Sequence, residues 1–332
     1  MSKKFILPIL VITLVLFVAY SYRPSSCFEV KGRPVLFTSG PLFVVATDSP
    51  GVDLYAFSGE GLKWSHKLPG RATLLSWAGE GLVVGTDSGY LLIFSKEGKQ
   101  LMKERLPGEP FLMDWSEGLA VVARSFGPEG ETSYVYPLGI KGNAVYYVKY
   151  FKGGLLLGFV NHTLLFLRDG LKWRMTCDEV LGVNETVAVR SGDKVLLLNE
   201  YGQIVDSISF PAEMGCWQGD LYLYGLDGLY RYEGRLRPVI KAKFYELSCN
   251  PLKGVVELKG KWYVFLNGKL YNVPDRPYNL QWWDGKLAFT YSRGVGLIKG
   301  EVTLLSGEFA GWAGDALAVY RDGKVCISGI NR

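Results

Sequence analysis

Histidine is almost absent from this sequence, which has two copies, His66 and His162, in 332 residues. A histidine base works only when the fold holds it beside a nucleophile and an orienting partner. His66 follows Trp64 in a strand-like run, and His162 lies within an Asn-His-Thr triplet, neither beside a plausible catalytic partner. The sequence therefore argues against histidine-dependent catalysis, and we assign no catalytic residue.

Charge is also scarce, at 21% of the residues, and no run of one sign is present. The 37 Lys and Arg residues outnumber the 32 Asp and Glu residues, giving a net charge of +5, but they are scattered singly. A protein that follows a nucleic-acid backbone needs a basic stripe or patch. We therefore expect no nucleic-acid partner.

Cysteine and methionine are rare as well, with five copies of each. Low counts of Cys, Met, His and Gln are typical of proteins from thermophiles, which avoid thermolabile side chains. Aspartate recurs beside glycine in predicted turns, where its side chain bonds the backbone two residues on, and no spacing matches an oxygen-ligand loop. We expect neither a metal nor a cofactor.

One long hydrophobic run is present, from Phe5 to Tyr20, and it follows Lys3 and Lys4. Positive charge before such a run directs the rest of the chain out of the cytoplasm. The run is short for a spanning helix, and a small-residue cleavage site ends at Ser21. Residues 1–22 are thus a signal peptide or a retained anchor, which places the remainder outside the cell membrane or secretes it.

Two triplets agree with export. Asn161 and Asn184 each begin an Asn-x-Thr sequence, the acceptor for N-glycosylation in cells that glycosylate secreted proteins. Both are candidate glycosylation sites.

The remaining composition favours β-structure, with 48% hydrophobic residues, 14% aromatic residues and 41 glycines. An aromatic residue, a Gly-containing turn and an apolar strand recur along the chain, followed by a hairpin such as DLYAFSGEGLKWSH. The apolar strands open 30 to 40 residues apart, at Leu42, Leu82, Leu119, Leu155, Val187, Leu221, Val255, Leu287 and Leu317. Four short strands at this period predict an all-β β-propeller.

The hairpin phrase resembles the repeat of the pyrroloquinoline-quinone-dehydrogenase-like (quinoprotein-like) propellers. Their blades end Ala-x-Asp-x-x-Thr-Gly-x-x-x-Trp, and the Trp docks on the neighbouring blade. Ala56 and Trp64 match the two ends, although the turn is two residues shorter and Ser58 replaces the Asp. Trp173 keeps the aromatic, whereas Met102 and Val205 replace it in other copies. The resemblance implies that Trp64 and Trp173 dock blades, and the chain's size resembles the non-catalytic short members.

The resemblance favours eight blades, with seven or nine as alternatives. The last copy ends after about three strands, and residues 124–142 lack a clear fourth strand. We expect residues 34–332 to form one propeller domain and residues 23–33 to contain a linker and a strand that completes the last blade. Cys27 and Cys326 would then lie on adjacent strands and form a disulfide in an exported protein.

Three further cysteines, Cys177, Cys216 and Cys249, fall in successive repeats. Because three is odd, at least one stays a thiol unless it finds another partner. A bridge between neighbouring blades and a set of small buried side chains both remain open.

Aromatic residues recur at the end of the first strand of the repeats: Trp77, Trp115, Tyr150, Trp217, Trp283 and Trp312. At one mouth of a channel they would form a belt for stacking a ligand. Between blades they would be structural wedges, which the regularity of the repeat favours.

We therefore expect a non-catalytic, membrane-associated or secreted propeller that binds a protein or glycan partner at the cell surface. Two alternatives remain. One is an extracytoplasmic lyase, hydrolase or sugar dehydrogenase that uses carboxylates such as Glu213, Asp220 and Asp284, and the other is an assembly factor for envelope proteins.

Overall fold

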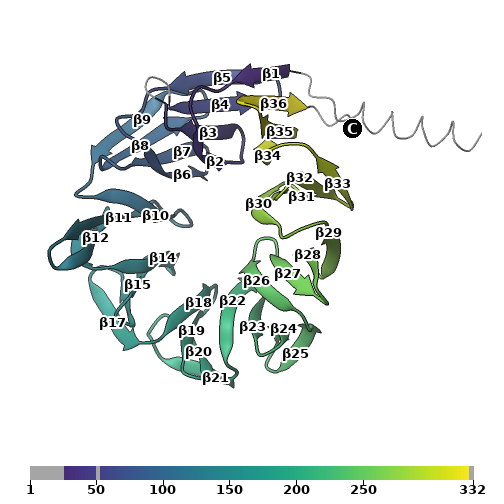
Figure 1. The fold of residues 1–332 in the computed structure, drawn as a ribbon. Coiled ribbons are helices and arrows are strands. Elements are labelled where there is room, and N and C mark those ends of the chain that lie inside the picture. The colour runs from purple at the N-terminus through teal and green to yellow at the C-terminus, as the bar shows by residue number, and fades with distance from the viewer. Residues whose placement is uncertain (1–25, 50–52, 329–332) are drawn as a thin grey trace, which may run out of the picture. The chain divides into compact units, whose positions relative to one another are not determined.

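The computed structural model describes residues 26–49 and 53–328, and all regular structure in these ranges is β-strand. The strands form nine antiparallel sheets of four, which are the blades of a β-propeller (Figure 1). Eight blades were favoured by the sequence and nine are found. The N-terminal hydrophobic run lies outside the described residues, and within them no helix is long and apolar enough to cross a membrane.

The chain divides into two compact units, which we treat separately. Within the described residues, unit 1 holds 26–49, 53–68, Lys96–Lys99 and 279–328, and unit 2 holds Pro69–Ser95 and Gln100–Tyr278. The expectation of one domain over residues 34–332 stays a prediction.

Unit 1 contains three blades. Blade 1 is β2 (Pro34–Thr38), β3 (Phe43–Thr47), β4 (Leu54–Ser58) and β5 (Gly61–His66). Blade 8 is β30 (Tyr278–Trp283), β31 (Lys286–Tyr291), β32 (Gly294–Lys299) and β33 (Glu301–Leu305). Blade 9 is β34 (Phe309–Ala313), β35 (Ala316–Arg321), β36 (Lys324–Ser328) and β1 (Ser26–Glu29).

Unit 2 contains the other six blades. Blade 2 is β6 (Ala72–Ala78), β7 (Gly81–Thr86), β8 (Tyr90–Ser95) and β9 (Gln100–Arg105). Blade 3 is β10 (Glu109–Asp114), β11 (Ala120–Gly127), β12 (Gly130–Tyr136) and β13 (Ile140–Asn143). Blade 4 is β14 (Val145–Phe151), β15 (Gly154–Phe159), β16 (Thr163–Leu167) and β17 (Leu171–Thr176). Blade 5 is β18 (Glu179–Val183), β19 (Val187–Ser191), β20 (Lys194–Leu198) and β21 (Ile204–Ser209). Blade 6 is β22 (Ala212–Gln218), β23 (Asp220–Gly225), β24 (Gly228–Tyr232) and β25 (Leu236–Ile240). Blade 7 is β26 (Lys243–Ser248), β27 (Lys253–Leu258), β28 (Lys261–Leu266) and β29 (Lys269–Val273).

The second strands are covered on both faces, which explains their continuous apolar sequences. Every residue of β3 and of β15 is buried, whereas β17, an outermost strand, alternates between exposed and half-buried positions. Within unit 2, successive blades pack through their first strands, and an apolar cluster fills each of the interfaces between blades 3 and 7. Each blade thus depends on its neighbours to bury its faces.

The fourth strand of blade 3 is an element that the sequence did not predict. It is β13, only four residues long, and its sequence Ile-Lys-Gly-Asn has no apolar run. Because β13 is held by pairing with β12 and not by its own hydrophobicity, its pattern gave no strand signal.

Blade 9 is built from both ends of the described chain. β1 pairs with β36, and Cys27 lies opposite Cys326 with their Cα atoms 4.0 Å apart. A disulfide bond joins the two sulfur atoms. The bond ties strands that are 299 residues apart in sequence.

We predict that this bond stabilises unit 1, because a crosslink across so long a segment restricts the unfolded chain. The double variant Cys27→Ser, Cys326→Ser should melt about 5 °C or more below the parent protein, as expected for a loss of roughly 2–4 kcal/mol. Circular dichroism melts with and without reductant measure the effect. The control is the response of the double variant to reductant, which reports the second disulfide alone. If reductant lowers the melting temperature of the parent and of the double variant by the same amount, the bond between Cys27 and Cys326 does not stabilise unit 1.

Candidate functional site

The six aromatic residues at the ends of first strands do not share one environment. Trp312 is 1% exposed and lies in the core of unit 1, where Lys286 Nζ is 5.5 Å from its ring centroid. Trp115 in unit 2 is 45% exposed. Those that are half-buried are Trp77, Tyr150, Trp217 and Trp283.

In unit 2 three of these rings lie against a glycine of the preceding blade. A Cβ placed on Gly79 would be 3.4 Å from Nε1 of Trp115, and one on Gly118 would be 3.1 Å from the Tyr150 hydroxyl. A Cβ on Gly182 would be 2.9 Å from Cδ1 of Trp217. These rings are inter-blade contacts whose outer edges reach solvent.

Trp64 and Trp173 make a second, more uniform contact. In unit 1, Trp64 Nε1 donates a hydrogen bond to the carbonyl of Lys96 at 2.9 Å, and a Cβ on Gly98 would lie 2.6 Å from the ring. In unit 2, Trp173 Nε1 donates to the carbonyl of Glu200 at 2.9 Å, and a Cβ on Gly202 would lie 2.7 Å from the ring. Each Trp thus docks on a turn between the third and fourth strands of the next blade.

Strand register identifies what replaces this Trp elsewhere in unit 2. Met102 lies opposite Ile93 in blade 2, as the sequence indicated. In blade 5 the equivalent residue is Asp206, which lies opposite Leu197, and not Val205. Asp206 follows Leu197 by nine positions, whereas Trp64 follows Ala56 by eight, and this longer hairpin is why counting along the sequence missed it.

A groove lies between blades 3 and 4, and we call it the inter-blade groove. It has a volume of about 450 Å³ and is lined by the apolar side chains of Leu138, Ile140, Leu155 and Leu167, together with Tyr150 and the turn 168–170. Leu138 is 49% exposed at its rim. A hollow of this size falls within the range of ligand pockets in proteins.

Asp114 of blade 3 ties the two blades together next to Tyr150, which lines the groove. Its carboxylate accepts hydrogen bonds from Lys149 Nζ at 2.5 Å, from the Tyr150 amide at 2.9 Å and from the Ser116 hydroxyl at 2.6 Å. Burial raises the pKa of this carboxyl, but the hydrogen bond from Lys149 and the others outweigh it, so the pKa lies below its usual value. Burial, with the charges of Asp114 and Glu117, raises the pKa of Tyr150, whose hydroxyl therefore stays neutral.

Further polar contacts fix the turns around the groove. Glu117 Oε2 accepts a hydrogen bond from the Gly153 amide at 2.7 Å, which ties blade 3 to blade 4. Lys152 forms an ion pair with Glu185 of blade 5. Arg168 bonds Glu200 of blade 5 and the Lys152 carbonyl, each at 3.0 Å. The charged groups around the groove are largely paired with one another, which leaves an apolar lining on a rigid frame.

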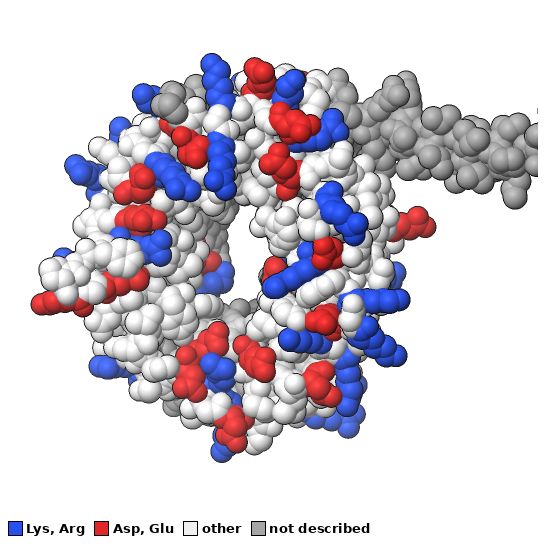
Figure 2. Space-filling model, viewed as in Figure 1, with Lys and Arg blue, Asp and Glu red and all other residues white. Residues whose placement is uncertain are grey.

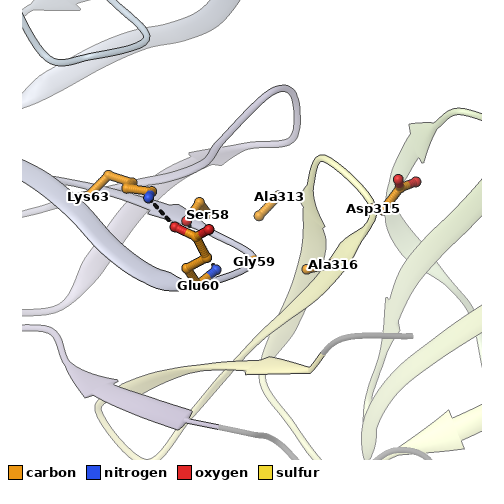
Figure 3. Close-up of a pocket in the computed structure, with 7 residues that line it drawn as sticks. All are labelled: Ser58, Gly59, Glu60, Lys63, Ala313, Asp315 and Ala316. Atoms are coloured by element: carbon orange, nitrogen blue, oxygen red, sulfur yellow. Dashed lines mark hydrogen bonds and ion pairs between the residues drawn. The ribbon is translucent and has the colours of Figure 1, made fainter. Parts of the chain in front are cut away.

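A second hollow lies in unit 1, between the turns after β4 and β34 (Figure 3). Its lining is mostly small residues, with Glu60 paired to Lys63 on one side and Asp315 on the other. Asp315 accepts a hydrogen bond from Lys286 at 2.7 Å. Because both carboxylates are held by lysines, the hollow offers no pair of acids poised for proton transfer.

The three carboxylates considered for an enzyme, Glu213, Asp220 and Asp284, do not come together within one unit. In unit 2, Asp220 is bound by Arg231 across the β23–β24 hairpin, and Glu213 lies on β22. Asp284 is an exposed turn residue of unit 1. The histidines are equally dispersed, with His66 hydrogen-bonded to the Gly98 carbonyl and His162 in an exposed turn.

The remaining sequence candidates fall in peripheral positions. Asn161 and Asn184 are exposed turn residues in unit 2. Cys216 and Cys249 form a disulfide between blades 6 and 7, and Cys177 is a buried free thiol whose pKa is raised to about 11, mainly by burial. Across residues 26–49 and 53–328, no cluster of His, Cys, Asp and Glu has the arrangement of a metal site. Figure 2 shows basic and acidic residues intermixed on the visible face.

Sequence reasoning missed the inter-blade groove because no single motif encodes it. The available signal was an omission, since the fourth strand of blade 3 carries no Trp, whereas those of blades 1 and 4 do.

We predict that Asp114→Asn destabilises unit 2 in a pH-dependent manner. A carboxyl whose folded pKa is lowered stabilises the fold above its unfolded pKa of about 3.9, and this contribution is lost as pH falls through the folded pKa. The variant should lose about 2 kcal/mol of unfolding free energy at pH 7, the scale of a hydrogen bond to a charged group, and progressively less below pH 4. Urea unfolding at pH 7 and pH 3 measures this. Asp169→Asn, at an exposed carboxyl, is the matched control, and a gap between parent and Asp114→Asn that does not change with pH would contradict the prediction.

No family model matches this chain, and neither does any curated protein. Among solved structures, the chain is similar to BamB from Moraxella catarrhalis, with 12% identity and a TM-score of 0.52 over 85% of this chain and 98% of that one. It is also similar to the computationally designed Ika8 protein, with 12% identity and a TM-score of 0.49 over 91% and 98% of the two chains. A third is Sqt1 from Saccharomyces cerevisiae, with 14% identity and a TM-score of 0.46 over 72% and 83%. The similarity to BamB shows that the fold is a β-propeller and shows nothing further about activity.

Proposed function

We propose that this chain is an exported, membrane-associated β-propeller that binds a protein partner at the cell surface and acts as a scaffold. The observation that carries the proposal is the inter-blade groove, which is apolar, open at its rim and held in place by paired charges. Such a groove is suited to binding, because its walls need no rearrangement when a ligand enters.

The polar groups at the groove favour a protein over a small polar substrate or a glycan. Arg168 is already bound to Glu200, and Lys149 to Asp114. A sugar needs several free donors and acceptors, whereas the lining offers mainly leucine, isoleucine and tyrosine side chains. Exposed apolar residues at a rim mark protein interaction sites.

Export rests on the sequence of residues 1–22, and the two disulfides support it for a cell that is not a thermophile. Disulfides persist in oxidising compartments and are rare in the cytosol of mesophiles. The expected location is the cell membrane with the propeller outside, or the medium after cleavage near Ser21.

The location is tested by fractionating cells that express the full chain or a version that begins at Arg23. We expect the full chain to reach the membrane pellet or the medium with its thiols oxidised, and the shortened version to stay in the cytosol. Alkylation before reduction, read by mass spectrometry, reports the thiols. Recovery of the full chain in the cytosol with free thiols would contradict export.

Partner binding is tested with a photo-reactive residue placed at Leu138 in cells. The control is the same residue at Phe126, which belongs to blade 3 but lies at the opposite end of the sheet and is 70% exposed. We expect a protein adduct from Leu138 and not from Phe126.

The captured protein must then bind the purified propeller, and Leu138→Glu should weaken this affinity at least about tenfold, because a charge would enter an apolar contact. Phe126→Glu should leave the affinity unchanged. Adducts of equal yield at both positions, or only glycan adducts at Leu138, would contradict the proposed protein-binding groove.

A further inference from the structure

At the inter-blade groove the Trp docking contact is missing, as it also is in the blades where Met102 and Asp206 replace the Trp. At the two sites where it is made, a fourth strand sends Trp64 or Trp173 over a turn glycine, Gly98 or Gly202. The corresponding turn glycine of blade 4 is Gly170, which lines the groove. A Cβ on Gly170 would meet no atom within 4 Å.

Strand register explains why the slot is open. Side chains alternate between faces along a strand, and residues paired across strands share a face. Trp64 pairs with Ala56, and Trp173 pairs with Phe166. In blade 3 the residue facing blade 4 is Ile140, which pairs with Val135 and packs into the core between these blades.

Following the pairing across the sheet shows which level Ile140 occupies. Ile140 is reached through Val135 and Val122 from Leu112, the residue that follows the bulge of the first strand. The residues reached in the same way are His66 in blade 1 and Met175 in blade 4, each two positions after the Trp. The hairpin of blade 3 therefore turns before it reaches the level of the Trp, and the inter-blade groove stays open beside Gly170.

We propose that this slot takes a tryptophan side chain presented by an extended segment of the partner protein, in the way Trp173 fills the slot of blade 5. The inference rests on the proposed function, since it names the feature of the partner that the inter-blade groove recognises. The chain itself supplies the evidence for the occupant. Indole over glycine, flanked by apolar side chains, is the packing that it uses twice at equivalent positions.

The test uses a peptide copied from the chain. The probe is the acetylated heptapeptide of residues 170–176, Gly-Leu-Lys-Trp-Arg-Met-Thr, and its matched control carries Trp173→Ala. Binding to the intact protein is followed by NMR of labelled Ile and Leu methyl groups. We expect saturable shifts at Leu138, Ile140, Leu155 and Leu167, with a Kd on the order of 1 mM for so small a ligand.

Three results should accompany this binding. The Trp173→Ala peptide should bind at least about tenfold more weakly. Ile140→Trp, which fills the slot from within, should abolish the shifts while the protein melts at or above the parent temperature. Phe126→Trp should leave the affinity unchanged. If Ile140→Trp does not fold, Leu138→Glu at the exposed rim provides the second blocking variant.

Failure of the inference is distinguishable from failure of the proposed function. Shifts outside the groove, or peptide binding that Ile140→Trp does not weaken, would overturn the tryptophan slot. A partner captured at Leu138 whose cross-linked segment contains no tryptophan would overturn it too, while leaving partner binding in place. Absence of both adduct and peptide binding would overturn the two together.

Discussion

A four-stranded sheet has two apolar faces and cannot bury either alone, so every blade of this protein depends on the fit of its neighbours. Each of these contacts pairs a large side chain of one blade with a glycine of a neighbouring blade. Trp64 on Gly98 and Trp173 on Gly202 are two instances, and Trp115 lies in the opposite direction, against Gly79 of the preceding blade. Adding a Cβ to Gly98 or Gly202 would displace a ring, so these turn glycines serve packing as well as backbone conformation.

This requirement explains which features were predictable. An inner strand covered on both faces must be apolar throughout, and a tight turn needs glycine, so the repeat and its four-stranded unit are evident in one sequence. The proximity of Cys27 and Cys326 followed from completing the last blade. These inferences use only local pattern and strand pairing.

Other features depend on information that no local pattern carries. β13 has no hydrophobic run, because its partner β12 and not its own composition holds it in place. The position equivalent to Trp173 in blade 5 is Asp206 and not Val205, because this hairpin is one residue longer than that of blade 1 and a sequence comparison cannot place the extra residue. Which of three cysteines pair depends on the distance between blades, and the structure selects Cys216 and Cys249. The inter-blade groove is harder still, because its lining comes from the β12–β13 hairpin of blade 3 and from several separate segments of blade 4.

The energetics of the groove indicate how a partner would have to use it. A tryptophan buries about 150–250 Å², which at about 25 cal/mol per Å² contributes about 4–6 kcal/mol. Association costs an estimated 4–15 kcal/mol, so one indole barely offsets the loss of freedom. A stable complex therefore needs contacts beyond the slot, and at the rim Leu138, which is 49% exposed, provides one. The slot would then select the side chain of the partner, while the rim would supply most of the affinity. Because Asp114 and Glu117 fix both the slot and the rim to the same two blades, neither part has to be ordered when the partner arrives.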